Sequence, residues 1–284
     1  MNGIINFLKP PGMSSNGAVV FLRGLLGCKT GHAGTLDPGA CGVLPICVGK
    51  ATRISSYMMG HEKEYIAELT FGIKTDTGDS YGEVTETCDI IPKQIESVLS
   101  EFIGNVTQQT PAYSAVKHNG RKLYELARKG IEVAPKLRQV EILDIEYLNQ
   151  TSDNSHLLRI VCGKGTYIRT LCEDIAKRLD TVAYMSFLAR SKCAGLNIND
   201  SVTADEIKAI ENRNEILHPM EHFLKDLPSV TADQQHRTAL FHGGRVPFEG
   251  ANSQTLVIYA GDELMGLGSI TDEQLKISTR LVDE

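Results

Sequence analysis

Asp37 is the residue whose surroundings are most typical of a catalytic group. It lies in a stretch rich in glycine and proline, residues 31–45, and it is the only Asp or Glu among the first 61 residues. Pro38 fixes its own φ angle and disfavours a helical conformation at Asp37, while the glycines allow a ligand to approach the backbone. A lone carboxylate held rigidly in such a loop indicates an active-site acid. The alternative is an ordinary Asp-Pro-Gly turn.

The spacing of the residues excludes three other common types of catalytic or binding site. A phosphate-binding loop ending at residues 49–51 lacks both its first Gly and its final Ser or Thr. A dinucleotide fingerprint beginning at Gly163 would need a third Gly where Ile168 stands. The sequence also lacks the Gly-x-Ser-x-Gly elbow of many hydrolases.

The cysteines and histidines do not indicate a metal site or a disulfide framework. The seven cysteines are odd in number and include no Cys-x-x-Cys pair, so we expect reduced thiols in a cytoplasmic protein. His218 and His222 have the spacing of a zincin pair but no flanking acid. A calcium loop starting at Asp76 would need Glu where Thr87 stands. We therefore expect no metal.

The composition is that of a globular protein, and its charge is segregated along the chain. Of the 284 residues, 42% are hydrophobic and 23% are charged, and no apolar run predicts a membrane span or a signal peptide. The net charge of −6 argues weakly against a nucleic-acid partner. However, residues 1–60 carry +4 and residues 111–140 carry +5, counting Lys and Arg against Asp and Glu. A polyanion such as a nucleic acid responds to the electrostatic field at the surface where it binds. Positively charged segments can, however, also be solvated surface without a partner.

Several helices are predicted from capping residues and apolar spacing. Ser14 or Ser15 can cap a helix that ends near Gly27, and Pro92 can open another helix. Further predicted helices cover about 50–59, 123–127, 168–179 and parts of the acidic segment 199–226.

The remaining patterns predict strands and one exposed segment. Alternation predicts a strand over 63–71, with Tyr65 on its apolar face. Other predicted strands cover 140–148, 156–162, 255–260 and 264–270. Residues 105–130 are predicted to be extended, basic and exposed, apart from their short helix. The apolar stretch within 180–192 is left without an assigned structure.

One acid, several aromatic residues and a few basic groups suit chemistry on a nucleobase. Such a base must leave its stack and enter a snug pocket, where stacking and hydrogen bonds hold it. Sequence-specific recognition of RNA generally takes single-stranded loops, whose bases are already splayed. The residues therefore favour an RNA-modifying enzyme, but they do not by themselves define the reaction.

An ordered set of motifs resembles the TruB family of tRNA pseudouridine synthases over most of residues 1–192. The resemblance implies a cytoplasmic enzyme that uses no cofactor and converts the uridine at position 55, in the T-loop of tRNA, to pseudouridine. The motifs are Lys-Pro-Pro-Gly-Met-Ser-Ser at 9–15, the Asp37 stretch at 31–45, Gly-Lys-Ala-Thr-Arg at 49–53, Tyr65, Ser-Ala-Val-Lys at 114–117 and Gly-Thr-Tyr-Ile-Arg at 165–169.

The resemblance also implies roles for particular residues. Asp37 would be the catalytic nucleophile on a flipped-out uridine, and Arg169 would pair with it, because a nearby guanidinium favours the ionised carboxylate. Tyr65 would stack on the uracil and take part in proton transfer at C5. Three further residues would bind the substrate: Tyr167 and Leu188 as walls of the base pocket, and His32 as the group that fills the space left by the flipped base. Lys9 would be structural.

The sequence departs from the family pattern at two places and has a short tail. Thr110-Pro111 stands where the family usually has Pro-Pro, and Leu188-Ala189-Arg190 stands where it usually has Leu-Arg-Arg. Both changes could alter RNA contacts. The tail resembles the PUA module that binds RNA in this family, although the motif is weak.

We therefore predict an α/β (α+β) protein with two domains. Residues 1–225 would form a catalytic domain with a mixed, mainly antiparallel sheet and a central cleft, and residues 226–284 a small β-rich, PUA-like domain. The expected partner is the T-arm stem-loop of tRNA, and the chain is expected to be a monomer away from membranes. Two other hypotheses stay open: an RNA chaperone for which isomerisation is secondary, and a nucleotide-binding enzyme. The route taken by Asp37, attack on the ribose or formation of a glycal, also stays open.

Overall fold

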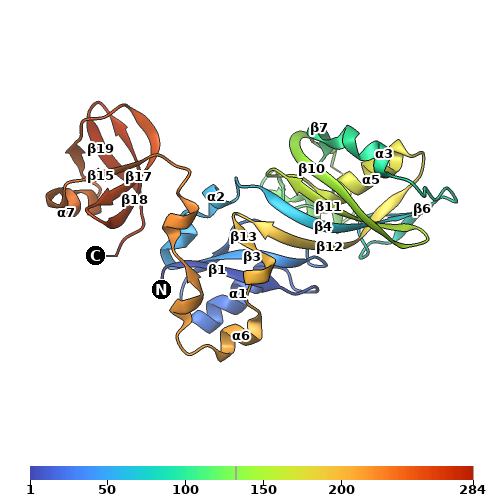
Figure 1. Ribbon diagram of the computed structural model, residues 1–284, viewed down its shortest axis with the longest axis horizontal. Helices are drawn as coiled ribbons and strands as arrows, with labels where there is room; N and C mark the ends of the chain where they lie inside the picture. Colours follow the sequence, from blue (N-terminus) through green and yellow to red (C-terminus); the bar gives the residue numbers. More distant parts are fainter. Residues whose placement is uncertain (132, 284) are drawn as a thin grey trace.

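The computed structural model describes residues 1–131 and 133–283, which form two β-sheets flanked by short helices (Figure 1). The large sheet has ten strands, in the order β14-β1-β3-β12-β4-β11-β10-β7, with β13 paired to β12 and β2 paired to β3. Its strands are β1 (Gly3–Lys9), β2 (Thr30–His32), β3 (Cys41–Val48), β4 (Lys63–Phe71), β7 (Gly104–Gln109), β10 (Leu137–Ser152), β11 (Ser155–Cys162), β12 (Ala183–Cys193), β13 (Leu196–Asn197) and β14 (Leu217–His218).

The large sheet is mixed and mainly antiparallel, which confirms the predicted fold class. The pairing of β12 with β3 is parallel, whereas β12 pairs with β4 in the antiparallel sense. Strand β12 therefore joins the strand that follows the Asp37 loop to the strand that carries Tyr65. Two small hairpins lie outside the sheet: β5 (Ile73–Thr75) with β6 (Val84–Thr87), and β8 (Lys117–His118) with β9 (Arg121–Lys122).

The first helix forms where its caps predict it. In α1 (Ser15–Leu26), the Ser14 hydroxyl accepts a hydrogen bond from the Gly17 N–H at 2.9 Å, and Gly27 ends the helix with a φ of 65°. Its apolar face packs into the same hydrophobic cluster as that of α5 (Ile168–Arg178) and the inner face of the sheet. The other helices are α2 (Ser55–Met58), α3 (Glu96–Leu99), α4 (Leu123–Ala127), α6 (Ala204–Ala209) and α7 (Arg237–Phe241).

Two expectations about elements need correction, and the structure assigns one stretch that had no predicted element. The helix expected from Pro92 begins only at Glu96, and it buries Val98 and Leu99. The segment expected to be extended and exposed begins instead as the edge strand β7, in which Gln108 is buried. The unassigned apolar stretch is β12, in the middle of the sheet, where strands on both sides supply its hydrogen bonds.

The tail forms a five-stranded sheet rather than only the two predicted strands. Two of the extra strands are short edge strands, which are stabilised by pairing with distant segments that a local pattern does not reveal, and the third forms a hairpin with the second predicted strand. The sheet consists of β15 (Ser229–Ala232), β16 (Arg245–Pro247), β17 (Ser253–Ala260), β18 (Glu263–Thr271) and β19 (Gln274–Arg280). Side chains of β17 and β18 share a hydrophobic cluster with residues 51–58 and 220–224.

Candidate active site

The loop that carries Asp37 connects β2 to β3 and is held by side chains from the N-terminal segment. The Ser15 hydroxyl lies 2.8 Å from both the backbone nitrogen and the carbonyl oxygen of Leu36. The Lys9 ammonium is buried and donates to three carbonyl oxygens, including that of Pro38 at 3.3 Å. These bonds satisfy the buried polar groups of the loop and fix its backbone on both sides of Asp37. Lys9 is thus a structural residue.

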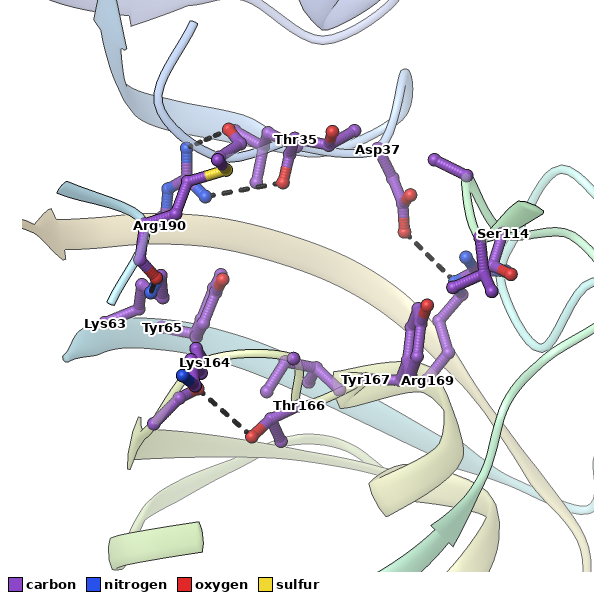
Figure 2. Close-up of a pocket in the computed structure, with 18 of the residues that line it drawn as sticks. Thr35, Asp37, Lys63, Tyr65, Ser114, Lys164, Thr166, Tyr167, Arg169 and Arg190 are labelled. Carbon is purple, nitrogen blue, oxygen red and sulfur yellow. Dashed lines mark hydrogen bonds and ion pairs between the residues drawn. The ribbon is translucent and has the colours of Figure 1, made fainter. Parts of the chain in front are cut away.

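Asp37 faces a fixed guanidinium (Figure 2). Its Oδ2 lies 3.0 Å from Nε of Arg169, whose side chain is 5% exposed, whereas that of Asp37 is 36% exposed. The two terminal nitrogens of Arg169 donate to the carbonyl oxygens of Thr77, at 2.7 Å, and Tyr113, at 2.9 Å. Because Arg169 is bound at three points, its guanidinium is fixed and holds the carboxylate of Asp37 in one place.

A second carboxylate lies near the same nitrogen of Arg169. Oδ2 of Asp79 is 3.7 Å from Nε of Arg169, and its side chain is 17% exposed. Sequence analysis did not select Asp79, because it lies in a turn with no unusual pattern. Its negative charge helps to compensate the buried guanidinium, which would otherwise be costly to desolvate.

Asp37 and Arg169 line a cavity of about 700 Å³. The cavity also contains Tyr65, Tyr167 and Leu188, so five of the six residues predicted for the site line one space. Its remaining lining residues are Gly34, Thr35, Leu36, Ser56, Met59, Gly60, Lys63, Ser114, Ala115, Val116, Arg138, Gln139, Gly163, Lys164, Gly165, Thr166, Ile168 and Arg190. This volume is large enough for a nucleoside.

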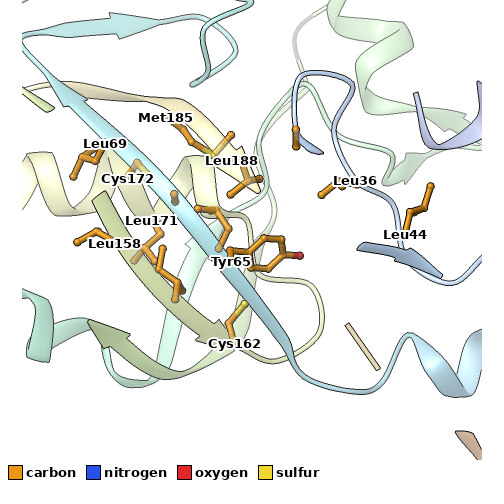
Figure 3. Close-up of a cluster of buried hydrophobic side chains, with 14 of the residues drawn as sticks. Leu36, Leu44, Tyr65, Leu69, Leu158, Cys162, Leu171, Cys172, Met185 and Leu188 are labelled. Atoms are coloured by element: carbon orange, nitrogen blue, oxygen red, sulfur yellow. The ribbon is translucent and has the colours of Figure 1, made fainter. Parts of the chain in front are cut away.

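Tyr65 forms part of the floor of the cavity and is largely buried. It lies on β4 and packs in the main hydrophobic cluster with Leu188 and Cys162 (Figure 3). Burial raises the pKa of Tyr65 to about 12, against a smaller opposing effect from Arg190. The phenol therefore keeps its proton at neutral pH, and it offers an apolar ring face with one hydroxyl.

Arg190 is a structural residue of the site that sequence analysis missed. Its guanidinium is 1% exposed and donates to the carbonyl oxygens of Val43 at 2.8 Å and Gly34 at 3.2 Å. In the sheet, Arg190 is paired with Gly42 on one side and Tyr65 on the other. Arg190 thus ties the Asp37 loop to β12. The departure from the family pattern in the triplet 188–190 is at Ala189, and its effect on RNA contacts stays a prediction.

His32 lies outside the set of described residues that line the cavity. It is in β2, paired with Ile46, and its Nδ1 is buried without a hydrogen-bond partner in the described part of the chain. Burial lowers the pKa of His32, and the nearby Arg190 lowers it further. The ring is thus neutral at neutral pH. Its role in filling the space of a flipped base stays a prediction.

A metal-binding cluster and a membrane-spanning helix are both absent from residues 1–131 and 133–283. No group of three or more His, Cys, Asp or Glu side chains there could hold a metal ion. No helix there is long and apolar enough to cross a membrane.

Solved structures with the same fold define the class. The chain aligns with a structure titled "Crystal Structure of a Cbf5-Nop10-Gar1 Complex" at a TM-score of 0.73 and 27% identity, covering 99% of this chain and 84% of that one. A second, "Structure of H/ACA RNP bound to a substrate RNA containing 2'-deoxyuridine", aligns at a TM-score of 0.72 and 24% identity, covering 99% and 85%. At this identity the second similarity concerns the fold alone. The large sheet with its cavity is thus a pseudouridine synthase fold.

Family models and sequence relatives identify the family. Residues 23–168 match the model described as "TruB family pseudouridylate synthase (N terminal domain)", and residues 169–225 match "tRNA pseudouridylate synthase B C-terminal domain". The proteins named tRNA pseudouridine synthase B from Alkaliphilus oremlandii and Streptococcus pneumoniae are 39% and 40% identical to the chain. The alignments cover 96% and 94% of this chain and 94% and 95% of those proteins. The chain belongs to the TruB family.

Proposed function

We propose that this protein converts the uridine at position 55 of tRNA to pseudouridine, with Asp37 as the catalytic carboxylate. The observation that carries the proposal is the contact between Asp37 and Arg169, at 3.0 Å, in the wall of a cavity of about 700 Å³. The relatives described above are named for this activity.

The reaction rearranges one nucleoside without any other reactant. The everted uridine enters the cavity, where the ring of Tyr65 and the side chain of Leu188 pack against the base. The bond between N1 and C1′ breaks, the uracil turns over in the cavity, and a bond forms between C5 and C1′. C5 then loses its proton and N1 gains one, so the product is an isomer of the substrate.

Asp37 can take part in this reaction in one of two ways. Its carboxylate can attack C1′ and hold the sugar as an ester while the base turns, or it can remove a proton from C2′ to give a glycal. Either step needs a carboxylate oxygen close to the ribose, and the ion pair with the buried Arg169 orients this oxygen. Neither step uses a metal or an organic cofactor.

Tyr65 acts as a stacking platform and a hydrogen-bonding group. Because the pKa of its phenol is about 12, the hydroxyl is protonated during turnover at neutral pH. The hydroxyl can donate a hydrogen bond to the base. It can also relay the proton of C5 if it first gives its own proton to another group, such as N1 of the base. Tyr167, the residue just before α5, forms a wall of the cavity.

The T-arm of the tRNA docks on the positively charged side of the cavity. Residues 111–140 carry a net charge of +5, and Ser114, Ala115 and Val116 of this segment line the cavity. A phosphate backbone gains affinity from such a segment despite the net charge of −6. Residues 226–284 form a second, PUA-like RNA-binding domain. The protein acts as a monomer in the cytoplasm.

The direct test is to map pseudouridine in unmodified tRNA after incubation with the native protein and with Asp37→Asn. The substitution keeps the shape of the side chain and removes its charge. We expect product at position 55 with the native protein. We expect a rate at least about 1,000-fold lower for Asp37→Asn, with RNA affinity little changed.

The matched control is Asp153→Asn, which alters an exposed acid in the turn between β10 and β11 and should leave the rate unchanged. Full activity of Asp37→Asn would exclude its catalytic role. No product at position 55 with the native protein would reject the proposed function itself.

A further inference from the structure

Gln108 is a buried polar residue that has no part in the chemistry described so far. It lies in the edge strand β7, and it is 1% exposed, whereas its neighbour Gln109 is exposed. It does not line the cavity formed by the described residues. A primary amide buried to this extent needs hydrogen-bond partners for both its oxygen and its nitrogen.

Both ends of the Gln108 amide bind the backbone of one residue, Tyr167. Nε2 of Gln108 donates to the Tyr167 carbonyl oxygen at 3.1 Å, and Oε1 accepts from the Tyr167 N–H at 3.0 Å. A pair of bonds to the N–H and C=O of one residue fixes the orientation of its backbone as well as its position, which a single bond does not.

Tyr167 lies immediately before the first residue of α5. It is the N-cap of the helix, and its own side chain makes no capping hydrogen bond. Its carbonyl oxygen also accepts the N–H of Leu171, at 3.1 Å. The first turn of a helix leaves backbone N–H groups without partners, so an amide from another strand that binds there determines where the helix starts.

The ring of Tyr167 is held from the paired strand. Gln108 is directly opposite Arg138 in the pairing of β7 with β10. Arg138 donates to the carbonyl oxygen of Gly165 at 3.1 Å, and its guanidinium lies 5.7 Å from the centre of the Tyr167 ring. Two adjacent strand residues thus fix one residue, Gln108 its backbone and Arg138 its ring.

The start of α5 also carries Arg169, the partner of Asp37. Arg169 follows Tyr167 by two residues, and it donates to the Tyr113 carbonyl oxygen in the segment after β7. A displacement of Tyr167 therefore moves a wall of the cavity and the guanidinium that orients the catalytic carboxylate together (Figure 2).

We propose that Gln108 is a positioning residue of the active site. Its amide places Tyr167 and the first turn of α5, and through them Arg169, without touching the substrate. This inference rests on the proposed function. It predicts that loss of the amide slows the chemical step on bound RNA more than it weakens binding of the RNA.

The test compares Gln108→Glu and Gln108→Ala with the neighbouring exposed control Gln109→Glu. An ionised Glu has the size of Gln and keeps the acceptor for the Tyr167 N–H, but it cannot donate to the carbonyl oxygen. We expect both Gln108 variants to lower the single-turnover rate at saturating enzyme by at least about tenfold, because small misplacements of catalytic groups are costly. The dissociation constant for the T-arm stem-loop should change by less than about threefold, and the control should match the native protein.

A merely structural residue would give a different pattern. The folded fraction, measured by circular dichroism, would fall, but the folded protein would react at the native rate, and that outcome would overturn the inference. If Gln108→Ala does not fold, the isosteric Gln108→Glu carries the comparison. Native protein that forms no pseudouridine would reject the proposed function instead, so the two failures are distinct.

A double-mutant cycle tests the route through Tyr167. If Gln108 acts through this residue, the rate loss in Gln108→Glu combined with Tyr167→Leu should be well below the product of the two single losses. Losses that multiply would show that Gln108 and Tyr167 act independently, and would overturn the inference.

Discussion

Two buried arginines in this site have different tasks, although both are 5% exposed or less. Arg169 faces the carboxylates of Asp37 and Asp79 and forms its shorter ion pair with Asp37. Arg190 binds backbone carbonyl oxygens of the loop at residues 34, 35 and 43. The first arginine therefore fixes the side chain of Asp37, and the second fixes the backbone of the loop that carries it. The charge of Arg190 also acts on its neighbours, since it lowers the pKa of His32.

His32 leads to a prediction about stability against pH. Its pKa lies below the ordinary value of 6.5, mainly because the ring is buried. Below pH 6.5 the unfolded chain therefore binds a proton that the folded protein resists, so stability that is present above this pH is lost as the pH falls.

Replacing the ring removes this effect. Between pH of about 7.5 and about 5.5, the free energy of unfolding should fall less in His32→Gln than in the native protein, measured by urea denaturation. His218 also has a lowered pKa, but it is present in both proteins and cancels in the comparison. Equal losses in both proteins would contradict the prediction.

At the scale of elements, strand β12 connects the two halves of the site. Its parallel pairing with β3 brings Arg190 against Gly42, at the start of the strand that follows the Asp37 loop. Gly42 has a φ of +106°, and a Cβ added there would lie 2.3 Å from the Arg190 carbonyl oxygen. Only glycine permits this approach of the two backbones.

Gly42→Ala should therefore separate β3 from β12. We expect a loss of about 2–4 kcal/mol in the free energy of unfolding, measured by chemical denaturation, and a slower rate of pseudouridine formation. Gly24→Ala is the control, because Gly24 is exposed in α1 and nothing lies within 4 Å of an added Cβ. That change should be neutral or stabilising by about 1 kcal/mol. An unchanged stability in Gly42→Ala would show that the strands can accommodate a side chain.

At the scale of the whole molecule, the chain combines an acidic total charge with a basic segment at the cavity. The five-stranded sheet of the tail packs against residues 51–58 and 220–224 (Figure 1). An ion pair between Lys50 and Asp283 and a hydrogen bond from Arg53 to the Arg280 carbonyl oxygen add to this contact. The tail is thus attached next to the helical segments that follow β3.

The basic segment should determine how RNA binding depends on salt. Arg121 and Lys129 are exposed, so reversing both charges should weaken T-arm binding and reduce the slope of log affinity against log salt by about two. The control is Lys93→Glu, at an exposed position in residues 61–110, where ten Asp and Glu outnumber three Lys and Arg. It should leave both quantities unchanged. An unchanged slope in the double variant, measured by filter binding from about 50 to 200 mM salt, would place the RNA on another surface.

The sequence alone determined the features that depend on neighbours in the chain. The caps of α1, the alternation of β4 and the helical spacing of α5 predicted these elements, because each is a local pattern. The motifs also predicted five of the residues that meet in the cavity. These residues come from separate segments of the chain, so their spacing does not show that they meet. The resemblance to a known family supplied that expectation.

Only the tertiary structure decided how those segments pair and which polar groups are buried together. Strand β12, the edge strands of the tail and the burial of Gln108 and Arg190 depend on partners far along the chain. A buried amide or guanidinium looks in sequence like any exposed one. It becomes a structural residue only when folding removes water and leaves particular backbone groups as its hydrogen-bond partners.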